Sequence, residues 1–451
     1  MGESMVDRTN IFAPSRRGRL LALFYSILAV QAVAVLILLN PWVAGDTDVY
    51  IRLAKSIDQG FYGEVLNGSY APDPLRPPGY PLILWVILDF LNLPVLAAAF
   101  TNILAYLGSV YLTGRFIGRI SPKTELAFLG LLLVYPMPAI YSSFIMTEAP
   151  VLFGLSLLVV LLARVDGLNI TVLAIGFVTG ASVLIRSDLL FLPLLVAAIA
   201  ATRSFLSDWI LRRAIAIGSA ILIVCGIVML PYTVWNYHNF GKASPIPVAS
   251  AVGSSLYIAT WQGKLPLDDI NAVWHGKITP RAKSAGLESE LTDINQRLGL
   301  PPRTAPWNPA VYPTLRTRID SQQLILRIAL DRIAADPLHY ATHVANNGWR
   351  LWVTSNYPES VPVPVQWALT VISILILLAG VAGCIAAVRR AAPWPVPIYP
   401  ALMLLYVPAI HVWLHTEARY TAAVRLILVA YAAVFVMMCA SKLRRRRVPA
   451  R

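Results

Sequence analysis

The stretch that decides the fold is residues 16–39, in which Arg16-Arg17-Gly18-Arg19 precedes LLALFYSILAVQAVAVLILL. About 20 consecutive apolar residues are enough for a helix to cross the hydrocarbon core of a bilayer. The run is also longer than the roughly 7–15 apolar residues typical of a cleavable signal peptide. The stretch therefore predicts an uncleaved signal anchor that begins in the cytoplasm.

The rest of the chain shares this apolar character. Of its 451 residues, 57% are hydrophobic and 13% are charged, a composition that excludes an ordinary soluble domain of this size. The net charge of +14 would also suit a nucleic-acid binder, but the basic residues gather beside apolar segments, as membrane topology requires. No nucleic-acid partner is therefore expected. The three cysteines lie within apolar runs, so they predict neither disulfides nor a metal site.

Further apolar segments repeat the pattern of residues 20–39 and predict an all-α polytopic membrane protein with about ten transmembrane helices. The other segments are residues 94–114, 124–142, 148–164, 169–185, 188–202, 213–232, 363–388, 395–414 and 418–440. Residues 79–93 are apolar too, but they are short and contain Asp89 and Asn92. They predict a helix in the membrane interface that belongs to the first outer loop.

Charge distinguishes between the possible topologies. With ten crossings and a cytoplasmic amino terminus, nearly every basic cluster lies in the cytoplasm, including Arg115 to Lys123 and Arg444 to Arg447, in agreement with the positive-inside rule. A crossing at residues 79–93 would move the first of these clusters to the outer face. We therefore expect a multi-pass protein of the inner or plasma membrane, with both termini in the cytoplasm.

This topology divides the chain into three parts. Residues 1–232 form an N-terminal transmembrane module with seven crossings and the first outer loop, 40–93, whereas residues 363–451 form a C-terminal module with three crossings and a basic tail. The segment between them, 233–362, is too long for a simple connection and predicts a small, mostly helical outer domain.

Two parts of this outer segment differ in pattern. Residues 318–335 carry apolar side chains at helical spacing and stop before Asp336-Pro337, which predicts a helix. Residues 262–313 are rich in proline and glycine and are expected to be irregular.

Clusters of polar and aromatic residues separate the crossings, and the predicted topology places all of them at the outer face. They are residues 45–50, 75–81, 146–148, 186–188, 235–238 and 415–420, together with the long segment 240–362. Acids, bases and aromatic side chains collected at one membrane face indicate a reaction centre at the boundary between water and lipid. That face is expected to be periplasmic or extracellular.

The acidic residues of the first cluster, Asp46 and Asp48, have two interpretations. One is structural, because Asp46 or Thr47 could cap an interfacial helix that runs through Ser56. The other is a general base, which must reach an acceptor hydroxyl group while it is ionised. In such a helix Asp46 and Tyr50 would lie one turn apart.

Arginines recur in the other clusters. Arg76 precedes Pro-Pro-Gly-Tyr-Pro, and a guanidinium held at the headgroup level can bind a phosphate through two parallel hydrogen bonds. General contact with lipid phosphates explains Arg76 equally well. Arg186 is expected to pair with Asp188. Arg425 lies inside the last apolar segment, where an arginine is costly and indicates a function by default.

The remaining polar candidates also have ordinary explanations. Glu148 suits the start of a helix, but it could bind sugar hydroxyls or an ion. His238 and Lys242 could complete an anion site, although aromatic and basic residues are common at membrane interfaces. His415 and Glu417 lack the spacing of helical zinc ligands.

The order of these motifs resembles that of the GT-C glycosyltransferases, especially bacterial members related to protein mannosyltransferases and to the lipid A aminoarabinose transferase. The resemblance rests mainly on Gly-Asp-Thr-Asp-Val-Tyr (45–50), Arg-Pro-Pro-Gly-Tyr-Pro (76–81) and Met-Thr-Glu (146–148). Ile-Arg-Ser-Asp-Leu (185–189), Trp-Asn-Tyr-His-Asn-Phe-Gly (235–241), Asp-Pro-Leu-His-Tyr (336–340) and Glu-Ala-Arg-Tyr (417–420) follow in the expected order.

The resemblance implies a membrane enzyme of GT-C type that takes a sugar from a polyprenyl-phosphate carrier. We expect an inverting transfer to a glycolipid or another surface acceptor, with the carrier's tail in an apolar groove beside residues 79–93. Asp46 would be the general base, with Asp48 as the alternative. The donor phosphate would be bound by Arg76, Arg419 and Lys242. The expected substrate-binding residues are Tyr50, Tyr80, Glu148, His238 and Tyr420.

Alternatives to this function remain. No cofactor is expected to be required, but Asp46, Asp48 and Glu148 could instead hold Mg or Mn, which prefer oxygen ligands. The acceptor could be a secreted protein in place of a glycolipid. A membrane transporter or lipid flippase is the alternative function, and it would place ionisable residues near the middle of the membrane and show internal repeats. The sequence shows no repeat.

Overall fold

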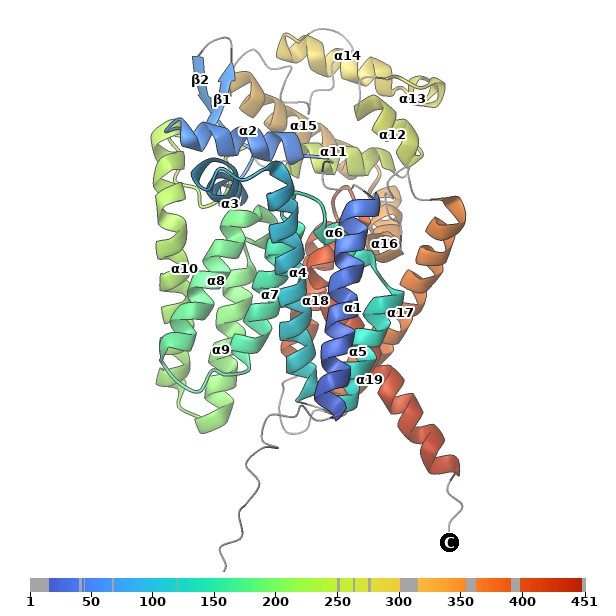
Figure 1. Ribbon diagram of the computed structural model, residues 1–451. Helices are drawn as coiled ribbons and strands as arrows, with labels where there is room; N and C mark the ends of the chain where they lie inside the picture. Colours follow the sequence, from blue (N-terminus) through green and yellow to red (C-terminus); the bar gives the residue numbers. More distant parts are fainter. Residues whose placement is uncertain are drawn as a thin grey trace, which may run out of the picture.

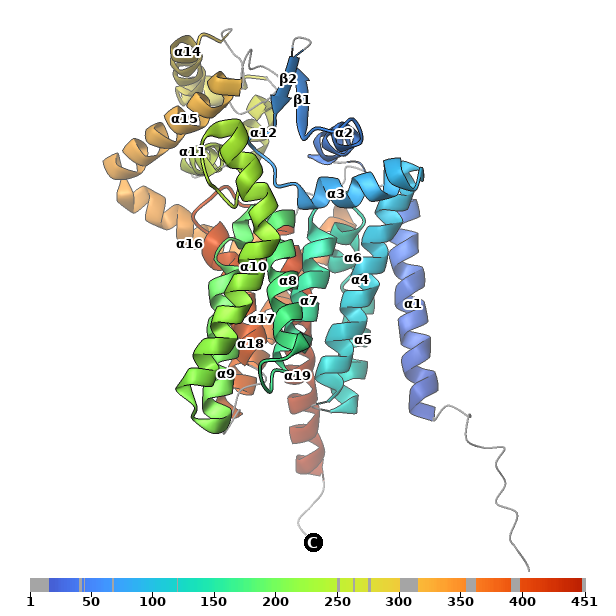
Figure 2. The same cartoon turned by 90° about the vertical axis from the view of Figure 1, so that its left-hand side faces the viewer.

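A computed structural model describes most of the chain as a bundle of helices with a layer of shorter elements over one end (Figures 1 and 2). The described residues are 16–39, 43, 45–66, 69–119, 121–249, 252–262, 264–274, 277–300, 315–353, 362–390 and 398–447. Within these ranges six helices are long and apolar enough to cross a membrane. A mostly helical, multi-pass membrane protein is thus confirmed, whereas the count of about ten crossings stays a prediction.

The long apolar helices coincide with predicted crossings. They are α1 (Arg16–Leu39), α4 (Val95–Gly118), α9 (Leu192–Asp208) with the turn η3 (Ser187–Leu189), α10 (Leu211–Phe240), α17 (Val363–Arg390) and α19 (Ala422–Arg447) with the turn η5 (Ala418–Thr421). The shorter helices of the bundle are α5 (Pro122–Val134), α6 (Met137–Ser142), α7 (Glu148–Leu162), α8 (Ile170–Ile185) and α18 (Ile398–His411).

Local sequence signals set several of these helix ends. The Ser121 side chain accepts a hydrogen bond from the backbone N–H of Lys123 at the start of α5, and that of Asn169 accepts one from Thr171 at the start of α8, as helix caps do. Residues 124–142 were predicted as one crossing, but they form two helices. The break follows from Pro136, which has no N–H to donate and cannot continue a helix.

The segment predicted to lie in the interface is helical and lies across the end of the bundle (Figure 2). It consists of α3 (Gly79–Trp85) and one π-helical turn, η2 (Val86–Phe90). The contact with α8 is close, since a Cβ on Gly79 would lie 2.6 Å from the Leu184 carbonyl oxygen. Glycine at the first position of α3 therefore allows α3 to pack closely against the end of α8.

The first loop also contains a β-hairpin, which the all-α prediction missed. Helix α2 (Thr47–Asp58) is followed by strand β1 (Gly63–Leu66), which pairs antiparallel with β2 (Ser69–Pro72). The rings of Phe61 and Tyr70 pack 4.8 Å apart, and the Tyr70 hydroxyl donates to the Tyr62 carbonyl oxygen at 2.8 Å. These aromatic contacts stabilise a hairpin that is too short to be stable alone.

A second group of helices covers the same end of the bundle and has its own apolar core. Its members are α11 (Val252–Gln262), α12 (Leu267–Trp274), α13 (Pro280–Ser284), α14 (Leu287–Leu298), α15 (Leu315–Ala335) and α16 (Pro337–Val353). The helix predicted at residues 318–335 is confirmed in α15. The boundaries 233 and 362 of the predicted outer domain stay predictions.

The irregular structure expected for residues 262–313 is wrong where α12, α13 and α14 form. In α14, Leu287, Leu291 and Ile294 recur at helical spacing and are buried in the core of the second group. Prolines and glycines delimit these helices without interrupting them, as Gly286 and Gly299 flank α14 in left-handed conformations. Residues 301–314 lie outside the described residues.

Arg425 of α19 has a structural role in this fold. Its side chain is 1% exposed, and it donates hydrogen bonds to the carbonyl oxygens of Trp352 and Ala418, each at 3.1 Å, and to the Tyr135 hydroxyl. It thereby ties α19 to the ends of α16 and α5. An intramembrane arginine satisfied by carbonyl groups in this way gives the transporter alternative no support.

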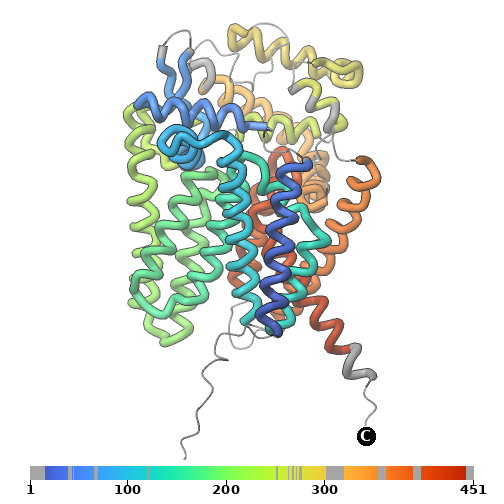
Figure 3. Tube along the Cα trace, viewed as in Figure 1, coloured from blue at the N-terminus to red at the C-terminus, as the bar shows by residue number. Residues whose placement is uncertain are grey.

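The helix ends that carry basic residues lie together. Helices α1 and α10 begin, and α4 and α17 end, at the end of the bundle opposite α2 and α3 (Figures 1 and 3). These ends carry Arg16, Arg115, Arg212 and Arg389. The positive-inside rule requires this arrangement if that end faces the cytoplasm.

The contact between α17 and α19 yields a stability prediction. A Cβ on Gly383 would overlap the Tyr431 carbonyl oxygen, so Gly383→Ala must push the two helices apart, at a cost of about 1–3 kcal/mol. We expect a lower melting temperature for the purified variant. The control is Gly226→Ala in α10, where a Cβ would meet nothing within 4 Å. Equal melting temperatures for the two variants would contradict this packing.

Candidate functional site

The candidate site is a cavity of about 340 Å³ between the bundle and the layer that covers it. We call it the Asp46 cavity. Six segments line it: the start of α2, the loop before α3, the corner between α6 and α7, the turn at residues 185–191, the stretch that contributes Ile246, Val252 and Ser255, and residues 410–420. Most of these are the polar clusters that the sequence placed at one membrane face.

The rim of the cavity is closed by an ion pair within the first loop. Asp46 stands at the cap position of α2, but its side chain makes no capping hydrogen bond. Its carboxylate instead accepts a hydrogen bond from Arg76 at 2.9 Å. The Arg76 guanidinium, with a smaller contribution from Arg419, lowers the pKa of Asp46 below its usual value. Asp46 is therefore ionised at neutral pH.

The backbone of Arg76 is fixed from both sides. The Asp73 carboxylate accepts hydrogen bonds from the backbone N–H groups of Leu75 and Arg76, each at 3.1 Å. The hydroxyls of Tyr62 and Tyr232 donate to the Arg76 carbonyl oxygen at 3.0 and 3.2 Å. Because α10 supplies Tyr232, the position of Arg76 is tied to the bundle. These hydrogen bonds fix the place from which the Arg76 side chain reaches the cavity.

The floor of the cavity comes from the corner before α7. Glu148 is 4% exposed at the first position of α7, and the preceding Thr147 makes no side-chain cap. Asn102 of α4 holds this corner by donating to the Phe144 carbonyl oxygen at 2.6 Å and to the Tyr80 hydroxyl at 3.1 Å. The sequence offered capping as the ordinary explanation of Glu148 and substrate binding as the functional one, and the side chain does line the cavity.

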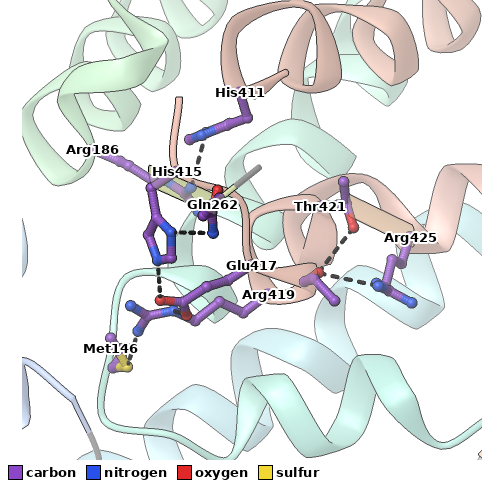
Figure 4. Close-up of polar contacts among 10 residues, drawn as sticks. Met146, Arg186, Gln262, His411, His415, Glu417, Arg419, Thr421 and Arg425 are labelled. Atoms are coloured by element: carbon purple, nitrogen blue, oxygen red, sulfur yellow. Dashed lines mark hydrogen bonds and ion pairs between the residues drawn. The ribbon is translucent and has the colours of Figure 1, made fainter. Parts of the chain in front are cut away.

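On the opposite wall a chain of polar contacts orients Arg419 (Figure 4). Arg419 forms an ion pair with Glu417 at 2.5 Å and donates to the Met146 sulfur at 3.2 Å. Glu417 in turn contacts the His415 ring at 3.1 Å, and His415 contacts Gln262 at 2.6 Å. Helix α11 of the second group, which supplies Gln262, thus helps to position an arginine of the site.

A further polar group lies beside Arg419. Arg186 pairs with Asp188 at 2.9 Å, as the sequence suggested. Asp188 also accepts from His411 of α18, with 2.6 Å between the two atoms. The His411 ring stacks on the Tyr420 ring with centroids 4.6 Å apart. Segments separated by more than 200 residues therefore build one wall.

The structure brings six of the ten candidate residues to the cavity: Asp46, Tyr50, Arg76, Glu148, Arg419 and Tyr420. Tyr80 is 0% exposed and lies behind the wall, where its ring packs against that of Tyr50 at 5.2 Å. Asp48, His238 and Lys242 are exposed and do not line the cavity. Their predicted roles in the site gain no support from their positions.

Several lining residues were not predicted as site residues. Arg186, Asp188, His411 and His415 all line the cavity. The sequence drew attention to three of them, but it showed no zinc-ligand spacing at His415 and explained Arg186 and Asp188 by mutual pairing. Their pairing does occur, and it leaves both side chains facing the cavity.

The alternative metal set of Asp46, Asp48 and Glu148 is not gathered into one group in the described structure. In the part of the chain that the structure describes, His, Cys, Asp and Glu side chains form no group of three or more able to hold a metal ion. Asp46 is paired with Arg76, and Asp48 is exposed outside the cavity. Binding of Mg or Mn by these carboxylates stays a prediction, which activity in the presence of EDTA would test.

Comparison with known proteins assigns the fold. No family model matches the chain, and no curated protein matches its sequence. The oligosaccharyltransferase of Archaeoglobus fulgidus, whose structure is tethered to an acceptor peptide, is 14% identical with a TM-score of 0.53. The match covers 95% of this chain and 50% of that one, so this chain spans half the length of the archaeal protein.

Two further matches have lower TM-scores. ArnT of Cupriavidus metallidurans is 14% identical in its structure bound to undecaprenyl phosphate, with a TM-score of 0.40 and coverage of 95% of this chain and 80% of that one. The match to the structure of ArnT in the apo state has a TM-score of 0.36. The match to the archaeal protein confirms the fold that the GT-C resemblance of the motifs implied.

The ion pairs of the site predict an acid-sensitive fold. Burial opposes the ionisation of Glu417, but Arg419 and His415 outweigh it and lower the pKa of Glu417 to about 2 from a usual 4.5. A carboxyl group with a lower pKa in the folded state stabilises the fold above its unfolded pKa, and this contribution is lost as the pH falls toward the folded value. The contribution of Glu417 is on the order of 3 kcal/mol.

The Glu417→Gln variant should therefore show a melting temperature that changes less than that of the wild type between about pH 5 and about pH 3. The melting temperature of the purified protein measures this directly. Asp48→Asn, which removes an exposed carboxyl group, is the control and should follow the wild type. The same pH dependence in Glu417→Gln and the wild type would show that the Glu417–Arg419 pair adds no stability.

Proposed function

We propose that this chain, which has the GT-C fold, is an integral-membrane inverting glycosyltransferase. It transfers a sugar from a polyprenyl-phosphate donor to a glycolipid or another surface acceptor. The observation that carries this proposal is the Asp46–Arg76 pair at 2.9 Å on the rim of a cavity that Arg419 also lines. A base for the acceptor hydroxyl and cations for the donor phosphate are the groups that such a transfer requires.

The orientation of the site in the membrane belongs to the same proposal. The basic helix ends lie at the end of the bundle opposite the Asp46 cavity. Since basic residues accumulate on the cytoplasmic side, the cavity faces the periplasm or the cell exterior, and both termini lie in the cytoplasm. Residues 233–362 then form the outer domain, and Gln262 of its helix α11 contacts His415 in the site.

Arg76 and Arg419 are the groups that bind the donor phosphate. Arg76 is held by the Tyr62 and Tyr232 hydroxyls, and Arg419 by Glu417. Both therefore face the place where negative charge develops as the phosphate leaves. Fixed donors of this kind contribute about 3–4 kcal/mol each to stabilisation of a transition state.

The donor controls the basicity of Asp46. In the structure Arg76 neutralises Asp46 and holds its pKa low, which favours the ionised form but weakens it as a base. A bound phosphate competes with the Asp46 carboxylate for the Arg76 guanidinium. As Arg76 turns toward the phosphate, the pKa of Asp46 rises toward its usual value. Asp46 becomes an effective base only when donor is present.

The chemical step is a single displacement at the anomeric carbon. Asp46 takes the proton of the acceptor hydroxyl while that oxygen forms a bond to the anomeric carbon. The bond between this carbon and the phosphate oxygen breaks on the opposite face, and its electron pair leaves with the polyprenyl phosphate. The configuration of the sugar is inverted, and no covalent enzyme intermediate forms.

The apolar tail of the donor has a path out of the cavity. Leu190, Phe191 and Ile410 form an apolar wall, and Phe191 is 59% exposed on the outside of the bundle. No residue of α3 or η2 lines the cavity, so the tail leaves beside α9 and α18. This differs from the groove beside residues 79–93 that the sequence suggested.

The base assignment predicts opposite behaviour for two neighbouring aspartates. Asp46→Asn should reduce transfer by about 10²–10⁴-fold, the usual contribution of a general base, whereas Asp48→Asn should retain it. A strain that lacks this chain and regains it as wild type or variant provides the assay. Mass spectrometry of its surface glycolipids should show one sugar-bearing species lost and then restored. Restoration by Asp46→Asn would exclude Asp46 as the base.

Binding of undecaprenyl phosphate to the purified protein separates the role of Arg76 from that of Asp46. Arg76→Gln should weaken binding about tenfold or more, because a charge-assisted pair of hydrogen bonds is lost. Asp46→Asn should bind at least as tightly as the wild type, because the carboxylate that competes with the phosphate is gone. The control is Arg52→Gln, an exposed arginine of α2 that pairs with Glu64. Weaker binding by Asp46→Asn would contradict the idea that the Asp46 carboxylate and the donor phosphate compete for the Arg76 guanidinium.

A further inference from the structure

A second cavity, of about 440 Å³, lies at the opposite end of the bundle from the Asp46 cavity. It lies where α1 and α5 begin and where α4 and α7 end. Its polar lining consists mainly of four arginines and one glutamate: Arg17, Arg115, Arg119, Arg164 and Glu125. We call it the Arg115 cavity. The proposed glycosyl transfer uses none of these residues.

A buried carboxylate organises one side of the Arg115 cavity. Glu125 is 0% exposed in the first turn of α5. It accepts from the Tyr25 hydroxyl at 3.2 Å and pairs with Arg17 at 3.4 Å and with Arg115 at 3.9 Å. The helix packing around it is close, since a Cβ on Gly118 would lie 2.6 Å from the Glu125 carboxylate. Two arginines are thereby held at fixed places in the wall.

The other two arginines give the Arg115 cavity an excess of positive charge. Arg119 and Arg164 are exposed, and neither has an ion-pair partner among the residues that the structure describes. A guanidinium presents several N–H groups in one plane and suits two-point contact with phosphate. Four such groups against one carboxylate favour an anionic ligand with a phosphate group.

Apolar surface continues from the Arg115 cavity along α4. Leu112, Phe116 and Val160 form part of its wall. Above them Tyr111 and Leu104, two turns apart on the same face of α4, are 55% and 66% exposed. A ligand with both a phosphate and apolar chains therefore fits this place better than a free phosphate does. Basic pockets between helices on the cytoplasmic side of a membrane are suited to such headgroups.

We propose that the Arg115 cavity binds the phosphate of an anionic glycerophospholipid, with the acyl chains against Tyr111 and Leu104. The lipid joins the starts of α1 and α5 to the ends of α4 and α7, at the face of the membrane opposite the Asp46 cavity. It acts as a bound structural ligand and takes no part in transfer. This site does not depend on the proposed function.

Native mass spectrometry of the full-length, delipidated protein tests this site with phosphatidylglycerol and phosphatidylcholine as probes. We expect one site with clear preference for phosphatidylglycerol. Arg119→Gln combined with Arg164→Gln should weaken its binding about tenfold, because charge-assisted hydrogen bonds are removed. Neither arginine has an ion-pair partner among the described residues, so the double variant should fold as the wild type does. Its melting temperature without lipid checks this.

The matched control is Arg212→Gln combined with Arg389→Gln. These two arginines are exposed on α10 and α17 at the same end of the bundle but do not line the Arg115 cavity. This variant should bind phosphatidylglycerol like the wild type. Equal binding of the two lipids, or an equal loss in both double variants, would overturn the proposal. Inorganic phosphate that stabilises the protein as well as phosphatidylglycerol does would overturn the assignment to a lipid.

Discussion

The contact between Asp46 and Arg76 is the interaction on which the rest of the site depends. It joins two ends of the first loop that lie 30 residues apart, and it sets the entry of both α2 and α3 onto the bundle. Thr47, next to Asp46, donates to the Ile145 carbonyl oxygen at 3.3 Å and so fixes α2 above the corner before α7. With this contact in place, carboxylates and guanidinium groups from distant segments share one cavity.

The three arginines of the Asp46 cavity are all paired with carboxylates. Each has its own carboxylate: Arg76 has Asp46, Arg186 has Asp188, and Arg419 has Glu417. Three buried guanidinium groups without carboxylate partners would be costly, whereas three buried ion pairs are tolerated. Pairing also keeps each guanidinium oriented in the absence of a ligand. In the proposed transfer, the donor phosphate would take the place of one of these carboxylates.

The sequence predicted the bundle well because the signal for a membrane helix is local. Apolar length alone located α1, α4, α10 and α17, whereas the division of residues 124–142 depended on Pro136. The hairpin was missed although Asn67-Gly68 is a strong hairpin signal. The prediction considered the length of each apolar segment and did not look for the alternation of apolar and polar residues that indicates a strand. Helices α12 to α14 were missed because proline and glycine were interpreted as irregularity when they mark helix ends.

The site was only partly predictable for a different reason. Asp46, Arg76, Glu148 and Arg419 meet because each stands at a helix end on the same side of the bundle, which topology alone implies. His238 was misplaced because the seventh crossing was expected to end at residue 232, whereas α10 continues to Phe240. The contact of His411 with Asp188 spans 223 residues, and no periodic pattern reveals a pairing of that range.

The apolar wall beside α9 has a consequence for how a lipid donor arrives. Phe191, which lines the Asp46 cavity, and Leu194, three residues further along, are 59% and 58% exposed. The proposed polyprenyl donor, dissolved in the bilayer, would reach that cavity by lateral diffusion within one leaflet, in two dimensions. Occupancy of the site would then follow the mole fraction of donor in the membrane and not its concentration in water.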